Sequence, residues 1–431
     1  MSRALRWGLG ALGLLIMALA LALVVLARPA APIAIVSTAT QAPPDAHTLQ
    51  RGRYLALQGN CQGCHTARGG TPYAGGRAIT TPYGLVYGSN LTPGAGGLAG
   101  WKADDFWRAL HHGQSRDGRW LNPVFPINNT TQIAREDSDA LFAYLQSLPP
   151  VDAAAPPHAL RWPYGTQLAL RAWRLLYFQP ADEQASARDA RADDEIRRGA
   201  YLVNGLGHCS ACHVPRNALS GHRDMLSLAG GPIPAQNWYA PSLLDPAQAG
   251  VQTWSAEDVV ALFRTGRTGQ AIATGPMAEV VQHSTQHWSE QDLRAMASYL
   301  RQLPITPAPP RPASEAPQER SLRAGGQRYE QYCAQCHGQQ GEGVAVYPPL
   351  AGNRAVLQDS PTNALQTVLN GGFGPATAGH PRPFGMPPFV LELNDQDLAD
   401  VLTFVRTQWG NQAAPVSALD VQQLRGSLGR R

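Results

Sequence analysis

CQGCH, at residues 61–65, places two cysteines and a histidine within five positions, and it decides how the rest of the chain can fold. The same arrangement returns as CSACH at 209–213 and as CAQCH at 333–337. The three pairs use all six cysteines of this 431-residue chain: Cys61 with Cys64, Cys209 with Cys212, and Cys333 with Cys336. Because the pairs lie much farther apart than the roughly 15–20 residues between the pairs of a zinc ribbon, each cluster must act alone.

The histidine that follows every pair argues against the two simplest interpretations. A lone C-x-x-C-H offers at most three zinc ligands from one short turn, and a redox disulfide makes no use of the histidine. The pattern is the attachment signature of c-type haem, in which both thiols form thioethers with the porphyrin and the histidine binds the iron. We therefore predict three covalently bound c-type haems, with His65, His213 and His337 as iron ligands; zinc or dithiol chemistry is the alternative.

An iron that only carries electrons needs a sixth ligand, and a methionine thioether in that place raises the reduction potential. Met277, in TGPMAEV, and Met386, in FGMPPF, each follow their histidine in a loop ahead of a final helix. We predict that they are the sixth ligands of the second and third haems. Met296 lies on the apolar face of a helix and is expected in the core.

The stretch around the first motif, residues 47–157, contains no methionine. Its equivalent loop, LNPVFPIN at 121–128, holds Phe125 where a thioether is expected. The sixth position of the first haem is therefore open, filled by water, or taken by another side chain. His111 and His112, on the preceding helix, are candidates, and a distant methionine such as Met225 is another.

The N-terminus predicts export. Trp7 to Ala27 form a run without charge, preceded by Arg3 and Arg6. As a helix this run is about 31 Å long, enough to cross a bilayer core of about 30 Å. An uncleaved anchor and a cleaved signal peptide both remain open, and both export the rest of the chain because the arginines stay cytoplasmic.

Internal repeats indicate helical modules. Short opening helices are expected at 51–60, 197–208 and 324–332, and final helices at 135–150, 288–304 and 394–410. The expected N-caps of the final helices are Asp137 or Ser138, Ser289 and Asn394. The first two modules share a further helix, at 100–113 and 253–266, which the third is expected to lack.

The fold class that follows is all-α, with three class I cytochrome c-like haem domains in tandem behind an N-terminal transmembrane or signal helix. The predicted boundaries are 1–46 for the anchor or signal and its linker, 47–157 for the first domain, 158–190 for a connecting helix and linker, 191–312 for the second domain, 313–415 for the third and 416–431 for the tail. The connecting stretch WPYGTQLALRAWRLLYF, 162–178, either packs on its own chain or docks on a partner or a membrane surface.

Charge excludes one class of partner. The formal net charge is only +4, Lys102 is the sole lysine, and no cluster of arginines forms a stripe typical of nucleic-acid binding. Glycine-rich turns such as GAGGLAG, 94–100, follow no strand, so no dinucleotide or phosphate site is expected.

The motifs together resemble a known family. GSNLTP (88–93), NWYAPSL (237–243), YPPLAGN (347–353) and DVLTFVRTQWGN (400–411), in this order, are similar to the trihaem cytochrome c subunits of bacterial membrane-bound dehydrogenases for alcohol, gluconate, sorbitol and related substrates. The resemblance covers residues from about 47 to 415. Met277 and Met386 match the family's axial methionines. Phe125 departs, since many members have P-x-M-P where this chain has PVFP.

This resemblance implies electron transfer. A separate dehydrogenase subunit would oxidise the substrate, and this chain would pass the electrons to ubiquinone or a terminal oxidase. The expected location is the bacterial inner membrane, with the haem domains facing the periplasm. The chain is not expected to be catalytic alone. The alternative is a haem enzyme that acts on a small molecule at an open first haem; a sensory or assembly protein is disfavoured because about six residues precede the apolar run.

Overall fold

The computed structural model describes residues 7, 13, 14, 17, 31–35, 43–190, 194–269, 271–306, 316–344, 346–383 and 385–428. Its contacts divide the chain into two compact units, Met1–Arg53 with Cys64–Ala187, and Tyr54–Gly63 with Arg188–Arg431. Most of the predicted anchor, 7–27, lies outside the described residues. Among those that are described, no helix is long and apolar enough to span a membrane.

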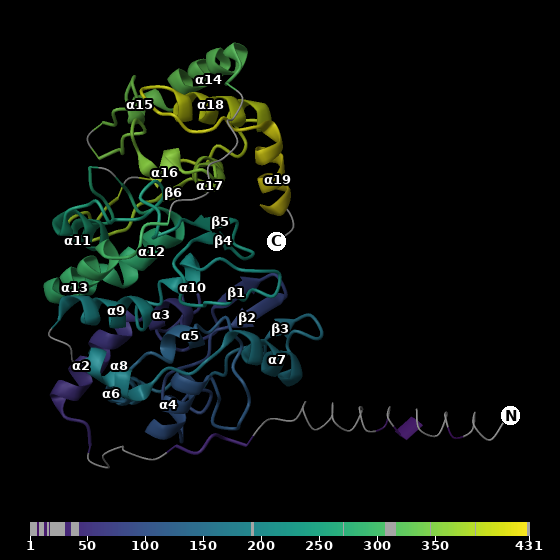
Figure 1. The fold of residues 1–431 in the computed structure, drawn as a ribbon, viewed down its shortest axis with the longest axis vertical. Coiled ribbons are helices and arrows are strands. Elements are labelled where there is room, and N and C mark those ends of the chain that lie inside the picture. Colours follow the sequence, from purple (N-terminus) through teal and green to yellow (C-terminus); the bar gives the residue numbers. More distant parts are fainter. Residues whose placement is uncertain are drawn as a thin grey trace. The chain divides into compact units, whose positions relative to one another are not determined.

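The described residues are mainly helical (Figure 1), as the all-α prediction requires. The helices are α2 Ala46–Gln58, α3 Cys61–Cys64, α4 Ala103–His112, α5 Ile127–Thr130, α6 Arg135–Gln146, α7 Gln167–Tyr177, α8 Glu183–Ala190, α9 Glu195–Asn204, α10 Ser210–His213, α11 Ala256–Thr265, α12 Gly275–His283, α13 Glu290–Arg301, α14 Glu319–Tyr332, α15 Ala334–His337, α16 Arg354–Leu357, α17 Thr362–Asn370, α18 Asp395–Thr407 and α19 Ala418–Leu428, with a 3-10 turn, η1, at Thr285–His287.

Short antiparallel ladders add to the helices, and the sequence did not predict them. They are β1 Ala78–Thr81, β2 Gly84–Tyr87 and β3 Ala159–Leu160 in one sheet, β4 Gly231–Ile233 with β5 Trp238–Ala240 in a second, and β6 Gly372–Phe373 with β7 Gly385–Met386 in a third. Strands of two to four residues are too short to produce an alternating pattern of apolar and polar residues. They lie in the connections between helices.

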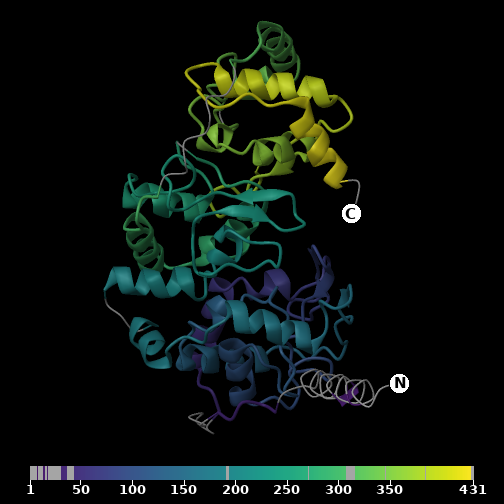
Figure 2. The ribbon, with the colours of Figure 1, turned by 45° about the vertical axis from the view of Figure 1, so that its right-hand side comes forward.

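The same helix crossing occurs three times. An opening helix (α2, α9 or α14) lies across a final helix (α6, α13 or α18), and a glycine stands at each crossing. A Cβ atom added at Gly52, Gly199 and Gly325 would lie 2.0, 2.0 and 2.2 Å from the carbonyl oxygens of Ala140, Ala295 and Asp400. The third crossing, between green α14 and yellow α18, lies at the top of Figure 2. Only glycine allows the two backbones to approach this closely.

An arginine–aspartate pair accompanies each crossing. Arg51 pairs with Asp137, Arg198 with Asp292 and Arg328 with Asp397. Asp137 and Asp292 are buried. Because a buried carboxylate is costly without a partner, the first two pairs fix how the opening and final helices face one another.

Two of the three predicted helix caps are confirmed. The Ser289 hydroxyl accepts from the backbone N–H of Asp292, and the Asn394 side chain accepts from those of Gln396 and Asp397. The prediction of Asp137 or Ser138 for α6 was wrong, because Ala134 is the N-cap and both residues lie inside the helix. Asp137 instead serves the crossing, where it binds Arg51.

The expectation that the third module lacks a middle helix was also wrong. α17, Thr362–Asn370, occupies this place and buries Leu365 and Leu369. Its N-cap, Pro361, provides no side-chain hydrogen bond, and the helix has no charged residue to mark its first or last turn. The predicted tail likewise contains α19, whose Val421 is fully buried against the core of the third module.

Candidate haem sites

Each C-x-x-C-H motif contains one short helical turn, which includes the histidine in the second and third motifs and ends at Cys64 in the first. α3, α10 and α15 come shortly after α2, α9 and α14, and the backbone N–H of His213 and His337 bonds to the carbonyl of the first cysteine of its motif, at 3.0 and 2.9 Å. A helical turn places residues three and four apart on the same side. The two thiols and the imidazole of a motif can therefore face one flat group together.

The three histidines each make the same kind of hydrogen bond. Nδ1 donates to the carbonyl oxygen of Ser89 from His65 (2.7 Å), of Pro241 from His213 (2.7 Å) and of Pro348 from His337 (2.9 Å). This bond fixes the tautomer and the orientation of the ring, and it leaves Nε2 as the basic nitrogen. Within the described part of the chain no hydrogen bond or ion pair engages Nε2 of these three rings. A ring held in this way is prepared to ligate a metal.

The backbone of each histidine is held by a hydrogen bond from a glycine in a turn. The carbonyls of His65, His213 and His337 accept from the backbone N–H groups of Gly75, Gly230 and Gly343 at 2.8, 2.6 and 2.8 Å. All three glycines have φ near +77°, and a Cβ on any of them would lie within 3 Å of the chain that provides the Nδ1 acceptor. These positions therefore require glycine.

Burial favours the neutral form of the three histidines and of the first thiol in the second and third motifs. Desolvation lowers the pKa of His65, His213 and His337, and the backbone hydrogen bond opposes it. Burial, with a smaller effect of the partner cysteine, raises the pKa of Cys209 to about 12 and that of Cys333 to about 11. Neutral, oriented imidazoles beside thiols in an apolar setting fit a covalently attached haem.

The predicted methionine ligands lie in different elements. Met277 is in the first turn of α12, and Met386 is in β7, where it pairs with Gly372. Both side chains are half-buried. Their binding to iron stays a prediction. Met296 is 1% exposed within α13, which confirms its place in the core, and the sulfur of Met225 accepts from the N–H of His222 in its own loop.

Phe125 occupies the backbone position of Met277. After α4 and α11, Leu121 and Ala273 donate their N–H groups to the capping glycines Gly113 and Gly266. Phe125 is the fourth residue after Leu121, and Met277 is the fourth residue after Ala273. Each then donates its own N–H to the residue three before it, Phe125 to Asn122 (3.0 Å) and Met277 to Thr274 (3.2 Å). The first domain therefore presents a phenyl ring where the second presents a thioether.

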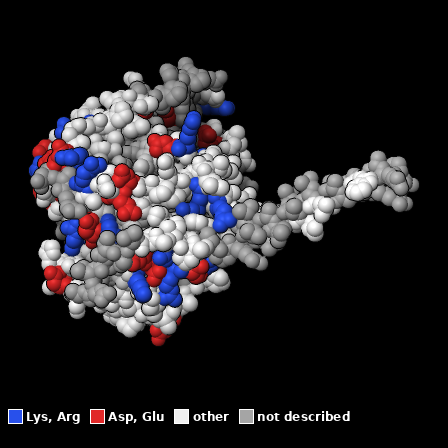
Figure 3. Space-filling model, turned by 60° about the horizontal axis from the view of Figure 1, so that its bottom comes forward, with Lys and Arg blue, Asp and Glu red and all other residues white. Residues whose placement is uncertain are grey.

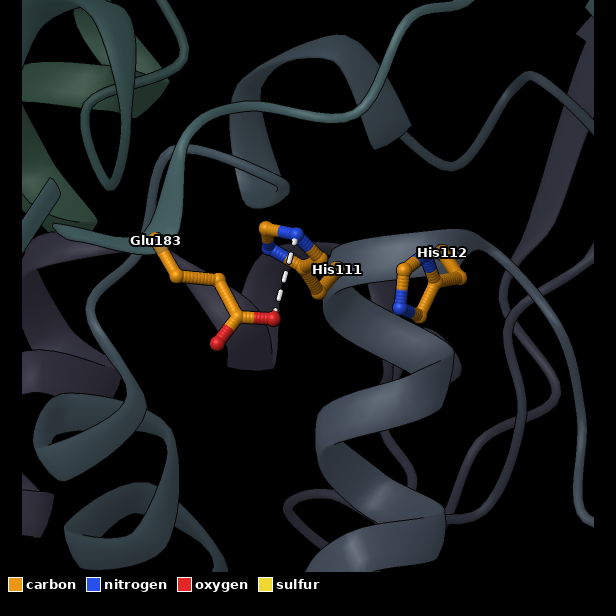
Figure 4. A group of neighbouring side chains, drawn as sticks. All are labelled: His111, His112 and Glu183. Carbon is orange, nitrogen blue, oxygen red and sulfur yellow. Dashed lines mark ion pairs between the residues drawn. The ribbon is translucent and has the colours of Figure 1, made fainter. Parts of the chain in front are cut away.

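His111 and His112 form a cluster with Glu183 (Figure 4). His111 is buried and stacks on Trp107 with ring centroids 4.5 Å apart. Its Nδ1 lies 3.5 Å from the Thr131 hydroxyl and its Nε2 lies 3.9 Å from the Glu183 carboxylate. Both ring nitrogens of His111 thus face protein groups, which argues against this residue as the sixth ligand.

One ligand atom from each member of this cluster lies within 4.8 Å of the others, a spacing that a metal ion could bridge. Burial lowers the pKa of His112 to about 4; the charges of His111, Arg174 and Arg108 act in the same direction, and that of Glu183 opposes them. A bound cation would therefore meet two arginines beside a single carboxylate. The cluster is better explained as packing between α4 and the segment that begins α8.

The comparisons with known proteins agree with this geometry. The model of the family described as Cytochrome c matches residues 49–149, 196–304 and 322–409. The chain belongs to the cytochrome c family. Haem binding and electron transfer follow from this membership, and each matched segment holds one C-x-x-C-H motif.

Relatives within the family are similar over most of the chain. The cytochrome c subunit of the quinone alcohol dehydrogenase of Gluconobacter oxydans is 38% identical and covers 88% of this chain, which in turn spans 83% of that protein. The gluconate 2-dehydrogenase cytochrome c subunit of Pantoea cypripedii is 36% identical, covering 88% and 89%, and the fructose dehydrogenase cytochrome subunit of Gluconobacter japonicus is 33% identical, covering 89% and 84%. The resemblance to dehydrogenase cytochrome subunits is confirmed.

Sequence reasoning missed the residues that orient the histidines. Ser89, Pro241 and Pro348 act through backbone carbonyls, which carry no signature of their own. A signal was nevertheless present, because each lies in a loop that the family resemblance had singled out: GSNLTP, NWYAPSL and YPPLAGN.

Proposed function

We propose that this chain is the trihaem electron-transfer subunit of a membrane-bound dehydrogenase. It receives electrons from a separate catalytic subunit, which oxidises an alcohol, a sugar or a sugar acid, and it passes them to ubiquinone or a terminal oxidase. The domains work at the periplasmic face of the bacterial inner membrane, and the apolar run 7–27 provides the anchor.

One observation supports this proposal most strongly: the same histidine geometry occurs three times, with Nδ1 bound to a backbone carbonyl. Haem, when bound, provides a one-electron couple. The three cysteine pairs, Cys61 with Cys64, Cys209 with Cys212 and Cys333 with Cys336, would each hold one haem, and His65, His213 and His337 would bind the iron through Nε2. Met277 and Met386 would provide the thioethers that raise two of the potentials.

The face drawn in Figure 3 shows no footprint for a nucleic acid. On the face drawn in Figure 3, blue basic and red acidic residues are intermixed and neither sign forms a stripe. Nucleic-acid binding requires a continuous basic footprint.

The test is made on the full chain produced with the bacterial haem-attachment machinery. Three covalent haems per denatured chain are expected, and the double variant Cys209→Ala, Cys212→Ala should retain two. Membranes that contain the chain and its co-purified dehydrogenase should reduce these haems when substrate is added. A wild-type chain with one haem or none, or robust substrate oxidation by this chain alone, would refute the proposal.

A second candidate function rests on Phe125. A phenyl ring has no lone pair to donate, so the first haem would keep a position at which a small molecule could bind. Carbon monoxide should then bind to one haem of the reduced wild-type chain and to none in the Phe125→Met variant. Absence of any carbon monoxide complex in the wild-type chain would exclude this function.

A further inference from the structure

Helix α7 presents an apolar face to solvent. Leu175 is 82% exposed and Leu176 62%, and Ala172, on the same face, is exposed as well. Just before the helix, Trp162 is 85% exposed. The opposite face holds Leu170, which is buried. A surface helix of a soluble domain normally turns polar residues outward, so α7 is apolar on both sides.

The helix is held firmly in this orientation. The Gln167 side chain accepts from the backbone N–H of Trp120 at 2.8 Å and donates to its carbonyl at 3.3 Å. The guanidinium group of Arg174 lies 4.2 Å from the ring centroids of both Trp120 and Phe178. Thr166 caps the helix by accepting from the N–H of Ala169. α7 therefore cannot turn its leucines inward without losing these contacts.

The chain that follows the predicted anchor meets the same part of the first unit. Ile33 donates its N–H to the Gln114 side chain at 2.8 Å, and its carbonyl accepts from Arg108 at 2.7 Å. Gln114 forms an antiparallel bridge with Trp120, the residue that α7 covers. The segment leading from the anchor and α7 are thus attached to one structural element.

This attachment limits the distance to the membrane. The uncharged run ends at Ala27, and the described chain resumes at Ala31. Four fully extended residues span at most about 14 Å. An anchor inserted in a bilayer would therefore hold the Gln114–Trp120 bridge close to the lipid headgroups.

Composition favours a lipid surface over a protein partner. Residues 153–181 contain no aspartate or glutamate, and the exposed Arg161 directly precedes Trp162. Exposed tryptophan and leucine beside arginine, without acidic residues, are typical of helices that lie in the interface of a membrane with anionic lipids.

We infer that α7 and Trp162 form a membrane-contact surface, with Leu175 and Leu176 inserted among the phospholipid headgroups so that the first domain lies against the bilayer. The inference rests on the membrane placement in the proposed function. It adds a second point of contact beside the anchor, which fixes the orientation of the first haem domain as well as its distance from the lipid.

The test uses the full, haem-loaded chain in vesicles of phosphatidylcholine and phosphatidylglycerol. All six native cysteines bind haem under the proposed function, so Leu176→Cys adds the single free thiol, which is labelled with bimane. Arg323→Cys, on α14 and with a side chain 73% exposed, is the matched control. Lipids that carry a nitroxide near the headgroup should quench bimane at position 176 at least twofold more than bimane at position 323.

The outcomes separate the two proposals. Bimane uptake by the wild-type chain would refute three attached haems before any quenching is measured. A chain that does not float with vesicles would overturn the membrane placement and this inference together. Flotation with equal quenching at both positions would overturn the α7 surface alone. Protection of position 176 from aqueous iodide without quenching by the lipids would also overturn the α7 surface, because a second copy of the chain would then cover α7.

Discussion

Substitution of Gly325 by alanine should destabilise the third domain, although alanine is the better helix former. A Cβ at this position would lie 2.2 Å from the carbonyl oxygen of Asp400 and 2.8 Å from the Cβ of Phe404. Carbon atoms in contact pack at about 3.5–4.0 Å. α14 and α18 must therefore separate by about 1 Å, which disturbs the core that contains Tyr329 and Leu398.

The net effect is a difference between two opposing terms. Overpacking of this kind costs about 1–3 kcal/mol, and replacement of a helical glycine by alanine regains about 0.5–1 kcal/mol. We expect a net loss of about 1 kcal/mol. For a domain of about 100 residues this lowers the melting temperature by about 4–8 °C.

The neighbouring glycine provides the control. Gly326 lies in the same helix, but its nearest contact would be 3.2 Å, to a ring carbon of Phe404 that can shift. Gly326→Ala should therefore melt at the wild-type temperature or slightly above it. The assay is far-ultraviolet circular dichroism of the haem-loaded full chain, and because several domains unfold, the two variants are compared with each other. Equal melting of both would show that the close crossing does not constrain the domain.

Three further predictions follow from the sites. Phe125→Met should raise the midpoint potential of one haem in a spectroelectrochemical titration and leave the other two unchanged. The rise should be on the order of 100 mV, because axial ligands control a span of about 0.8 V. Three unchanged potentials would contradict the backbone equivalence with Met277. Gly230→Ala should disturb the turn behind His213 and weaken the ligation of the second haem, visible as a changed Soret band, whereas Gly269→Ala, where nothing lies within 4 Å, should not. Burial lowers the folded-state pKa of His112 to about 4, so the unfolded chain binds one more proton than the folded chain between about pH 6.5 and 4. The free energy of unfolding should therefore fall as the pH falls through this range. In urea unfolding, the His112→Asn variant should lose part of this pH dependence, and an unchanged pH profile would assign the dependence to other groups.

The sequence predicted the elements that carry a periodic pattern or a fixed motif. The final helices have strong apolar faces, and Ser289 and Asn394 cap two of them as expected. α17 was missed because a proline replaces its capping side chain and no charged residue marks its ends. The short strands were missed because two to four residues show no alternation.

The candidate sites also contain residues that the sequence could predict and residues that it could not. Cysteine and histidine can be recognised from spacing alone, because the chemistry requires those side chains. The Nδ1 acceptors cannot, since a carbonyl of Ser89 or of Pro241 is chemically the same as any other and only the fold brings it to the ring. Sequence reasoning placed Phe125 where a thioether is expected, and the shared hydrogen bonds of the loop give the same alignment with Met277.

Under the proposed function, this division explains how three similar cytochrome c segments can have different reduction potentials. The histidine side of each site consists of backbone carbonyls and positive-φ glycines, so it is set by the fold and is the same in all three. Under the proposed function, the opposite side of each haem depends on one side chain, and its loop differs between the three segments: a turn before α5 for Phe125, the first turn of α12 for Met277, and β7 for Met386. A substitution on that side can therefore shift one potential without unfolding its domain. A change at Gly75, Gly230 or Gly343 instead disturbs the support of the histidine, and with it the site itself.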